Sequence, residues 1–193
     1  MAPVILFLVR HGESTWNVEK RWQGQADPPL SELGVAQARS AVLRMPTGFE
    51  QVVTSDLARA RNTAELLAAG LGLPLVVDER VRERYAGPWE GLTRDEIETR
   101  WPGMLADGRR PDDYEADEPL LERVLAALDP IEPPTIVVTH GGVIRVIERH
   151  LGAPLGRIPN LSALMLTREG TDFVAGQRFD LCGDGDVALE AGG

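Results

Sequence analysis

The sequence predicts an α/β protein, built as a three-layer α/β/α sandwich around a mostly parallel sheet. Short apolar runs typical of strands alternate with longer segments typical of helices along most of the chain. The runs at 4–9 and 135–139 are continuous and rich in β-branched residues, which suits strands buried on both faces. A length of 193 residues favours one domain with an ample core. We expect that domain over residues 1–182, followed by a loose acidic tail at 183–193.

Turn and capping residues between the apolar runs set the predicted elements. Ser31 is a suitable N-cap for the first long helix, and Ser55-Asp56 for the second, which we expect to stop at Gly70 and Gly72. Residues 12–30 are polar and rich in Gly, Asp and Pro, so they are predicted to form a loop. The expected strands are 4–9, 51–54, 75–77 and 135–139, with two edge strands around Gly170 between about 161 and 179. The expected helices are about 31–44, 57–69, 93–100, 120–128 and 143–150.

Composition excludes several classes of protein. Thirty acidic and 20 basic residues give a net charge of −10, which argues against a nucleic-acid partner and requires any anion to be held by local charge. The single cysteine, Cys182, leaves no internal disulfide or cysteine zinc site, so we expect a cytoplasmic location. No apolar run is long enough to span a membrane, and the first run lacks the basic flank of a signal peptide. The single lysine, Lys20, lies in a polar stretch unsuited to Schiff-base chemistry.

Two of the predicted strands end in the same way. Arg10-His11-Gly12 follows the first strand, and His140-Gly141-Gly142 follows the strand at 135–139. Ligands of open α/β sheets bind beyond the carboxyl ends of the strands, so these histidines meet above one edge if their strands are neighbours. The glycines would let a ligand approach the backbone, and the helix after Gly142 would offer N–H groups to an anion. Either His-Gly pair alone equally suits an ordinary loop, but two in matching contexts favour a site.

Arg59 and Glu83 are two further charged residues that are candidates for this site. Arg59 lies in the first turn of the helix after strand 51–54, where its guanidinium can make bidentate hydrogen bonds to a phosphoryl group or a plain surface salt bridge. Glu83 stands before the aromatic, glycine-rich turn at 87–91. It is either a proton donor or one acid in a charged loop.

Together these segments resemble the histidine phosphatase superfamily, the phosphoglycerate mutase-like enzymes, and more closely its phosphatase branch. The resemblance rests on Leu8-Val9-Arg10-His11-Gly12-Glu13-Ser14, on residues 55–63, on Glu83 ahead of 87–91, and on Val138-Thr139-His140-Gly141-Gly142, in the order of the family. It spans about residues 3–168. It implies the family's sandwich fold and phosphohistidine chemistry, without a cofactor or metal.

The resemblance also implies roles for single residues. His11 would be the nucleophile and Glu83 the proton donor, and Arg10, Arg59 and His140 would bind the phosphate. A neutral imidazole attacks and leaves phosphorus readily, so one hard hydrolysis becomes two easier steps on a small phosphorylated metabolite. The further substrate-binding residues expected are Ser14 and Asn17, which match the family pattern RHG-E-[ST]-x-x-N, together with Gln23, Arg84, as a contact to a second anionic group, and Gly141.

Two other classes of protein fit the sequence less well. A metal hydrolase would use histidine ligands, but the three histidines, His11, His140 and His150, form no H-E-x-x-H motif and have no clustered aspartates. A catalytically silent binding module is the non-enzyme alternative, since a fold does not guarantee turnover. Every catalytic position of the family is filled, which favours an enzyme.

The main alternative within the family is a mutase that moves a phosphoryl group between positions of a phosphorylated acid or sugar. Family mutases carry a long insertion after the catalytic glutamate, whereas the stretch from Gly91 to Thr135 is short here. Arg94 and Arg109-Arg110 are candidates for the basic residues of a mutase, but we interpret them as solvated loop charge. The chain has Glu115-Ala116-Asp117-Glu118 where phosphatase relatives often have Gly-Glu-Ser, which predicts an unusual substrate lid.

The physiological substrate does not follow from these residues, because specificity lies in the loops at 18–30 and 92–120. The oligomeric state is also open, with a homodimer as one alternative. The aromatic residues that are candidates for a leaving-group pocket, or for ordinary packing, are Trp16, Trp22, Tyr85 and Trp89.

Overall fold

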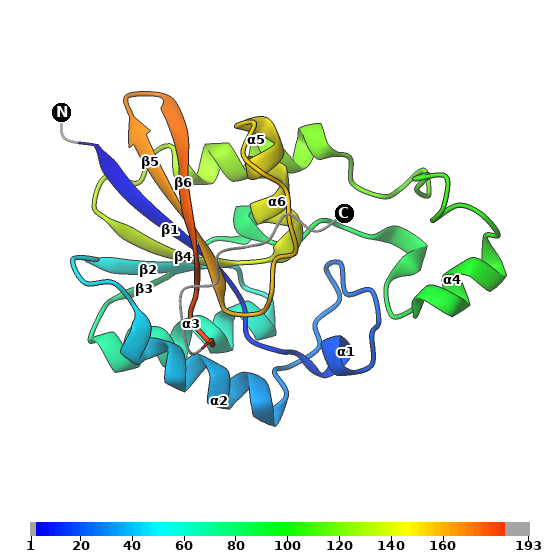
Figure 1. Ribbon diagram of the computed structural model, residues 1–193, viewed down its shortest axis with the longest axis horizontal. Helices are drawn as coiled ribbons and strands as arrows, with labels where there is room; N and C mark the ends of the chain where they lie inside the picture. The colour runs from blue at the N-terminus through cyan, green and yellow to red at the C-terminus, as the bar shows by residue number, and fades with distance from the viewer. Residues whose placement is uncertain (1–2, 184–193) are drawn as a thin grey trace.

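The computed structural model describes residues 3–183, in which six strands form one mixed sheet (Figure 1). The strand order is β3-β2-β4-β1-β5-β6. β3, β2, β4 and β1 are parallel to one another, and β5 is antiparallel to both of its neighbours, β1 and β6. The predicted α/β class with a mostly parallel sheet is therefore confirmed. The strands are β1 (Val4–Arg10), β2 (Gln51–Thr54), β3 (Leu75–Val77), β4 (Thr135–Thr139), β5 (Ser162–Glu169) and β6 (Asp172–Asp180).

Helices cover both faces of the sheet, which completes the three layers. Figure 1 shows α2 and α3 on one side and α5 and α6 on the other. The α-helices are α1 (Thr15–Val18), α2 (Glu32–Ala41), α3 (Ala58–Leu71), α4 (Arg94–Arg100), α5 (Asp117–Leu128) and α6 (Gly141–His150). Three short 3₁₀ helices are η1 (Val42–Arg44), η2 (Glu79–Val81) and η3 (Gly87–Trp89).

The buried apolar run in β1 divides its side chains between two cores. Leu6 and Leu8 pack on the α5 and α6 side, while Phe7 and Val9 pack on the α2 and α3 side. All four are fully buried, as expected for a strand with helices on both faces. The sheet position of β1, between β4 and β5, fixes the end of this strand firmly.

Several predicted boundaries differ from the structure. The last two strands were both expected at an edge, but β5 lies between β1 and β6, so of these two strands only β6 lies at an edge of the sheet. The loop at 12–30 contains α1, because Ser14 and Asn17 form a reciprocal capping box. Helix α3 passes through Gly70 and ends at Gly72. Of the predicted tail at 183–193, all but Gly183 lies outside the described residues.

The N-terminus of α3 is capped from a distant part of the chain. Ser55 and Asp56 were the predicted caps, but neither side chain caps α3, whose N-cap residue is Leu57. Asp27 instead accepts a hydrogen bond of 2.5 Å from the backbone N–H of Ala58, while Asp56 forms an ion pair with Arg82. The loop that contains Asp27 is thereby fixed to the start of α3.

Gly12 permits close packing of the backbone against α2 and does not make room for a ligand. A Cβ at this position would lie 2.7 Å from the carbonyl oxygen of Gly34 in α2. A Cβ on Gly34 would in turn lie 2.0 Å from the carbonyl oxygen of Glu13. The segment after β1 therefore passes directly over α2, and only two glycines permit that distance. This result corrects our expectation that Gly12 clears a path for a ligand.

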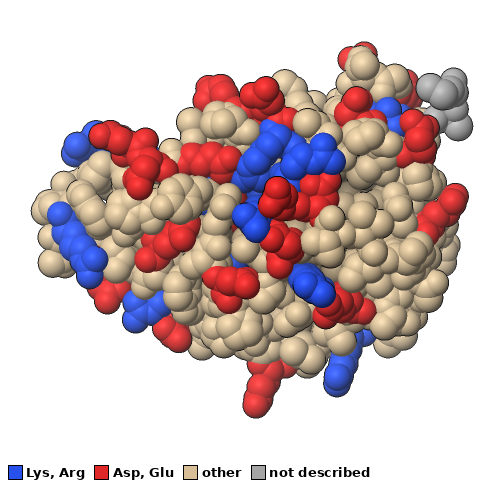
Figure 2. Space-filling model, turned by 180° about the vertical axis from the view of Figure 1, so that it is seen from behind, with Lys and Arg blue, Asp and Glu red and all other residues tan. Residues whose placement is uncertain are grey.

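Acidic and basic side chains intermingle on the surface. On the face shown in Figure 2, a central group of Lys and Arg side chains is bordered by Asp and Glu side chains. Among residues 3–183, no helix has the length and apolar character needed to cross a membrane.

Candidate active site

The two histidines meet at the carboxyl edge of the sheet. β1 and β4 are parallel neighbours, with Arg10 opposite Thr139. The backbone N–H of His11 donates to the carbonyl oxygen of Thr139 at 3.0 Å, so the pairing extends one residue beyond the strand. The His11 and His140 rings lie edge to face, with centroids 5.2 Å apart. The expectation that neighbouring strands bring the histidines together is confirmed.

The position and tautomer of His11 are fixed by backbone groups. Its Nδ1 lies 2.7 Å from the carbonyl oxygen of Gly12, an atom that only accepts, so Nδ1 carries the ring proton. The N–H of Gly12 is held by Thr63 Oγ1 at 3.0 Å. The carbonyl oxygen of His11 accepts from Asn160 Nδ2 at 3.0 Å. Nε2 is therefore left with its lone pair, as a nucleophilic imidazole requires.

Burial keeps the His11 ring uncharged. The side chain is almost completely buried, which is the main reason that its pKa is well below the ordinary value of 6.5. The positive charges of Arg59 and Arg10 lower this pKa further. At pH 7 the Nε2 lone pair is consequently free of a proton.

His140 lies behind the cavity rather than in its lining. The ring is fully buried, and within residues 3–183 neither ring nitrogen has a hydrogen-bond partner. Burial is the main cause of its low pKa, with further contributions from Arg59 and His11. A buried unpaired polar group costs about 1–3 kcal/mol, which a hydrogen bond to a bound group would recover. A phosphate contact by His140 remains a prediction.

Arg59 is fully buried at the start of α3 and points into the site, not to the surface. Its two terminal nitrogens donate to the carbonyl oxygens of Ala26 at 2.7 Å and Gly24 at 2.8 Å. Burial lowers its pKa to about 10, against the opposing effect of Glu83. Glu90 steadies the same loop by accepting from the backbone of Gln25 at 2.7 Å. The surface salt bridge that we weighed for Arg59 is therefore wrong.

Arg10 supplies the second guanidinium. Its Nη1 donates to the carbonyl oxygen of Ile158 at 2.5 Å, and burial lowers its pKa, opposed by Glu83. Within the described chain the Nε atoms of Arg10 and Arg59 are buried without a partner. Two fixed guanidiniums with spare donors form a suitable site for an oxyanion.

Glu83 is held at the N-terminus of α6. Its Oε2 accepts from the backbone N–H of Gly142 at 3.0 Å, and its Oε1 accepts from the N–H of Arg84 at 2.8 Å. Arg123 and Gln25 both donate to the carbonyl oxygen of Glu83, at 3.0 and 3.1 Å. The backbone N–H of Gly142 thus holds a protein carboxylate, whereas we expected it to face a bound anion.

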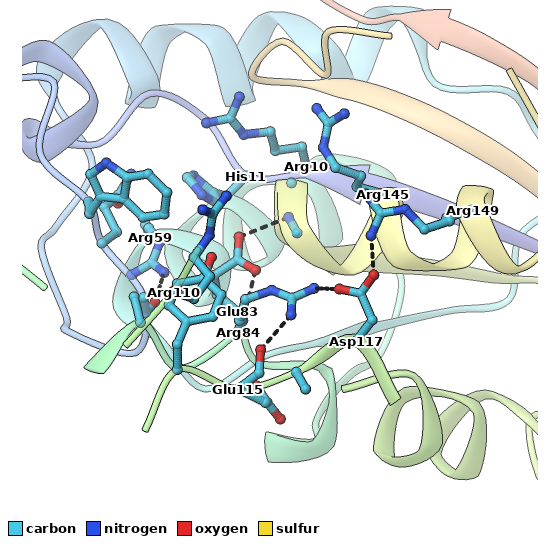
Figure 3. A pocket seen from close by; sticks show the side chains of 18 of the residues that line it. Arg10, His11, Arg59, Glu83, Arg84, Arg110, Glu115, Asp117, Arg145 and Arg149 are labelled. Carbon is cyan, nitrogen blue, oxygen red and sulfur yellow. Dashed lines mark hydrogen bonds and ion pairs between the residues drawn. The ribbon is translucent and has the colours of Figure 1, made fainter. Parts of the chain in front are cut away.

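These side chains face one cavity of about 680 Å³ (Figure 3). Arg10, His11, Arg59 and Glu83 line its inner end. Of the other predicted substrate-binding residues, Gln23, Arg84 and Gly141 line it as well. Ser14 and Asn17 do not line the cavity.

Ser14 and Asn17 bind protein groups. They cap α1 together, Ser14 Oγ lies 2.7 Å from Gln23 Oε1, and Asn17 Oδ1 accepts from Asn160 Nδ2 at 3.2 Å. Both side chains therefore brace the loop around the site. Any direct contact between them and a substrate stays a prediction.

The sequence interpretation missed five residues of this site. Arg123 and Asn160 position Glu83 and His11 through backbone carbonyls, and no local pattern signals such contacts. Arg145 and Arg149 line the outer part of the cavity from α6. Their spacing of four residues, in the helix that follows His140, was the signal that would have found them. Tyr114 also lines the cavity.

We considered Arg94, Arg109 and Arg110 either as solvated loop charge or as the basic residues of a mutase site. Arg94 is exposed, and Arg109 pairs with Asp107 at 2.8 Å, as solvated loop charge would. Arg110 instead lines the cavity with its guanidinium 5.2 Å from the Trp89 ring centre and 5.9 Å from that of Trp22. Arg110 is exposed, as the solvated interpretation predicts, but it also lies against aromatic faces that attract its charge.

Among the described residues, no group of three or more His, Cys, Asp or Glu side chains is arranged to hold a metal ion.

Comparison with known proteins identifies the family. The model of the histidine phosphatase superfamily, branch 1, matches residues 6–175. The chain belongs to this superfamily. The match includes the two strand ends and all five residues to which we assigned catalytic roles.

Relatives in this superfamily carry both mutase and phosphatase names. The chain is 38% identical over 149 residues to a probable phosphoglycerate mutase GpmB of Photorhabdus laumondii, covering 70% of this chain and 69% of the relative. It is 31% identical to a mycobacterial glucosyl-3-phosphoglycerate phosphatase solved with VO3, with TM-score 0.75 over 90% of this chain and 96% of the other. Bacillus stearothermophilus YhfR is 31% identical, with TM-score 0.79 over 89% and 95% of the two chains.

Replacing Gly142 by alanine is expected to lower kcat about 10- to 100-fold. A Cβ at this position would lie 2.1 Å from Glu83 Oε1, so the Glu83 carboxyl group would be displaced. Gly141→Ala is the matched comparison, since its Cβ would meet Arg10 Nε at an ordinary 3.6 Å. Steady-state kinetics and circular dichroism of both variants test this. Equal losses in the two variants would show that Glu83 placement is not the cause.

Stability is expected to fall as pH falls below about 6.5, because His11 and His140 have lower pKa values in the folded than in the unfolded protein. Between those values the unfolded chain binds more protons, so acid favours unfolding. Each of the two rings should lower the free energy of unfolding by about 1 kcal/mol when the pH falls from 7.5 to 5.5. Urea unfolding at both pH values measures this decrease in the free energy of unfolding. The decrease should be smaller in the His11→Asn/His140→Asn double variant than in the wild type. An undiminished loss in that variant would refute the assignment.

Proposed function

We propose that this protein is a metal-independent phosphomonoesterase that hydrolyses small phosphorylated metabolites through a phosphohistidine on His11. The observation that carries the proposal is the His11 ring, which has its proton on Nδ1 and its Nε2 free, beside the guanidiniums of Arg10 and Arg59. Membership of the histidine phosphatase superfamily supports it.

In the first step the Nε2 lone pair of His11 forms a bond to phosphorus as the ester P–O bond breaks. Glu83 gives a proton to the departing oxygen, so the leaving group departs as an alcohol. The ring gains positive charge when Nε2 is phosphorylated. The Gly12 carbonyl oxygen, 2.7 Å from Nδ1, stabilises that charge.

In the second step a water molecule attacks phosphorus. Glu83 accepts its proton, the P–N bond breaks, and the electron pair returns to Nε2, which releases inorganic phosphate. Glu83 is thus the carboxylic acid before the first step and the carboxylate before the second, and the backbone N–H groups of Gly142 and Arg84 position its carboxyl group.

Arg10 and Arg59 stabilise the charge on the transferring phosphoryl group. Their guanidiniums are fixed by the carbonyl oxygens of Ile158, Ala26 and Gly24, so little reorganisation is needed during transfer. One preorganised donor of this kind is worth about 3–4 kcal/mol of barrier. This is the charge stabilisation that a metal ion supplies in other phosphatases.

Phosphoryl transfer between positions of a phosphorylated acid, as in a mutase, is the second candidate and is favoured by the names of the GpmB relatives. The cavity supports hydrolysis better. Arg110 and Arg149 in its lining are exposed, so the outer end opens to water. A mutase has to shield its phosphohistidine from water.

A screen of phosphomonoesters that includes 3-phosphoglycerate and sugar phosphates tests the proposal. We expect release of inorganic phosphate, no interconversion of 3- and 2-phosphoglycerate, and no loss of activity with a chelator. Efficient interconversion with little phosphate release would establish the mutase instead.

A further inference from the structure

The outer wall of the cavity carries more positive charge than the phosphate site requires. Arg145 and Arg149 lie one turn apart on α6, and both line the cavity beyond the inner arginines. Figure 3 shows both side chains on this helix. Like charges four residues apart on a helix repel each other and destabilise it. Two arginines in this arrangement therefore point to a ligand.

Arg149 shares one carboxylate with a second arginine. Asp117 contacts Arg149 and also pairs with Arg84 at 2.5 Å (Figure 3). Glu115, the other acid at this end, is engaged by Arg123 at 2.8 Å. The two acids of the outer cavity are thus already paired with arginines, and Asp117 balances only one of its two guanidiniums.

Arg145 pairs with no carboxylate among residues 3–183. Its hydrogen bond is to the carbonyl oxygen of Gly156, at 3.2 Å. Some exposed arginines pair with acids, as Arg61 does with Glu65 and Arg109 with Asp107, but these arginines do not line the inner or outer wall of the cavity. An arginine that lines the cavity, and that pairs with no acid of the described segment, is available to an anion that enters the cavity.

The charge of Arg145 reaches the catalytic end. Burial is the main cause of the low pKa of Arg10, Glu83 opposes it, and the positive charges of Arg157 and Arg145 lower the pKa further. An anion bound beside Arg145 would relieve repulsion among these guanidiniums.

We propose that Arg145 and Arg149 form a subsite for a second anionic group, so that the preferred substrates are phosphomonoesters whose leaving group ends in a carboxylate or phosphate. This inference rests on the proposed function and names its substrate class. The rise of a helix places Arg145 and Arg149 about 6 and 12 Å along α6 from Gly141 at the phosphate end. The second anion consequently belongs at the far end of an extended leaving group.

The subsite also revises the role that we expected for Arg84. Its guanidinium is bound to Asp117 and to the carbonyl oxygen of Glu115, so it orients the acid that faces Arg149. Arg145 can bind an anion without displacing an acid of the described segment.

Two pairs of esters test the subsite. 3-Phosphooxypropanoate and 6-phosphooxyhexanoate carry a terminal carboxylate, and propyl phosphate and hexyl phosphate are their uncharged counterparts. We expect kcat/KM to favour 6-phosphooxyhexanoate over hexyl phosphate about tenfold, the value of one charge-assisted hydrogen bond. The preference should be smaller in the shorter pair, whose carboxylate stops short of Arg149.

The variants separate the subsite from the reaction. Arg145→Gln and Arg149→Gln should each reduce the preference for the longer carboxylate towards one. Arg39→Gln, an exposed arginine on α2 across the sheet, should keep it. Hydrolysis of all four esters without a preference, or a preference that survives Arg145→Gln, would overturn the subsite and leave the proposed function standing. Failure to hydrolyse any of the four would overturn the proposed function, and the subsite with it.

Discussion

Replacing His11 by asparagine is expected to lower kcat for phosphomonoester hydrolysis by about 10⁴-fold or more, because an amide has no nucleophilic nitrogen that could bond to phosphorus. The side chain is of similar size, and the backbone groups of His11 are held by Thr139 and Asn160 whatever the side chain. We therefore expect the variant to fold. Single-turnover and steady-state assays with one ester measure the loss.

Binding of inorganic phosphate serves as the control for this variant. Arg10 and Arg59 remain in place, so calorimetry should show that phosphate still binds to the inner cavity. A His11→Asn protein that binds phosphate but turns over at more than a hundredth of the wild-type rate would show that another group is the nucleophile.

Replacing Arg59 by lysine should lower kcat/KM about 10²- to 10³-fold. Lysine keeps the positive charge but loses the planar fork, which donates to the carbonyl oxygens of Ala26 and Gly24 while Nε is free. The loss corresponds to about 3–4 kcal/mol of barrier.

Arg61→Lys is the matched control, since Arg61 lies two residues further along α3, is exposed and pairs with Glu65 at 2.9 Å. Its kinetics should equal those of the wild type, and thermal unfolding of both variants separates loss of activity from loss of fold. If both substitutions had the same small effect, the Arg59 guanidinium would not stabilise the transition state.

Local patterns in the sequence were sufficient to predict the sheet and the ends of its strands. The apolar, β-branched runs predicted the full extents of β2, β3 and β4, because each run has turn residues at both ends. Burial on both faces explains this for β4, whereas Val76 and Val77 of the edge strand β3 are exposed. His11 and His140 met as predicted, because parallel neighbours end at the same edge.

Contacts between distant segments were beyond such patterns. Asp27 caps α3, Asn160 holds the backbone of His11, and Arg123 holds the backbone of Glu83, across separations of 31, 149 and 40 residues. In each case a side chain binds a main-chain atom. Any polar side chain of suitable length can make such a hydrogen bond, so the residue type does not reveal the partner. The role of Gly12 was misread for a related reason, since its neighbour Gly34 is close only in the fold.

Trapping the phosphorylated protein tests the central claim most directly. Rapid quenching of the wild-type enzyme with a ³²P-labelled phosphomonoester, followed by peptide mapping, should capture an acid-labile, alkali-stable phosphoryl group on His11, absent from His11→Asn. Continued turnover with no phosphorylated intermediate at any quench time, or a label on a different residue, would contradict the account.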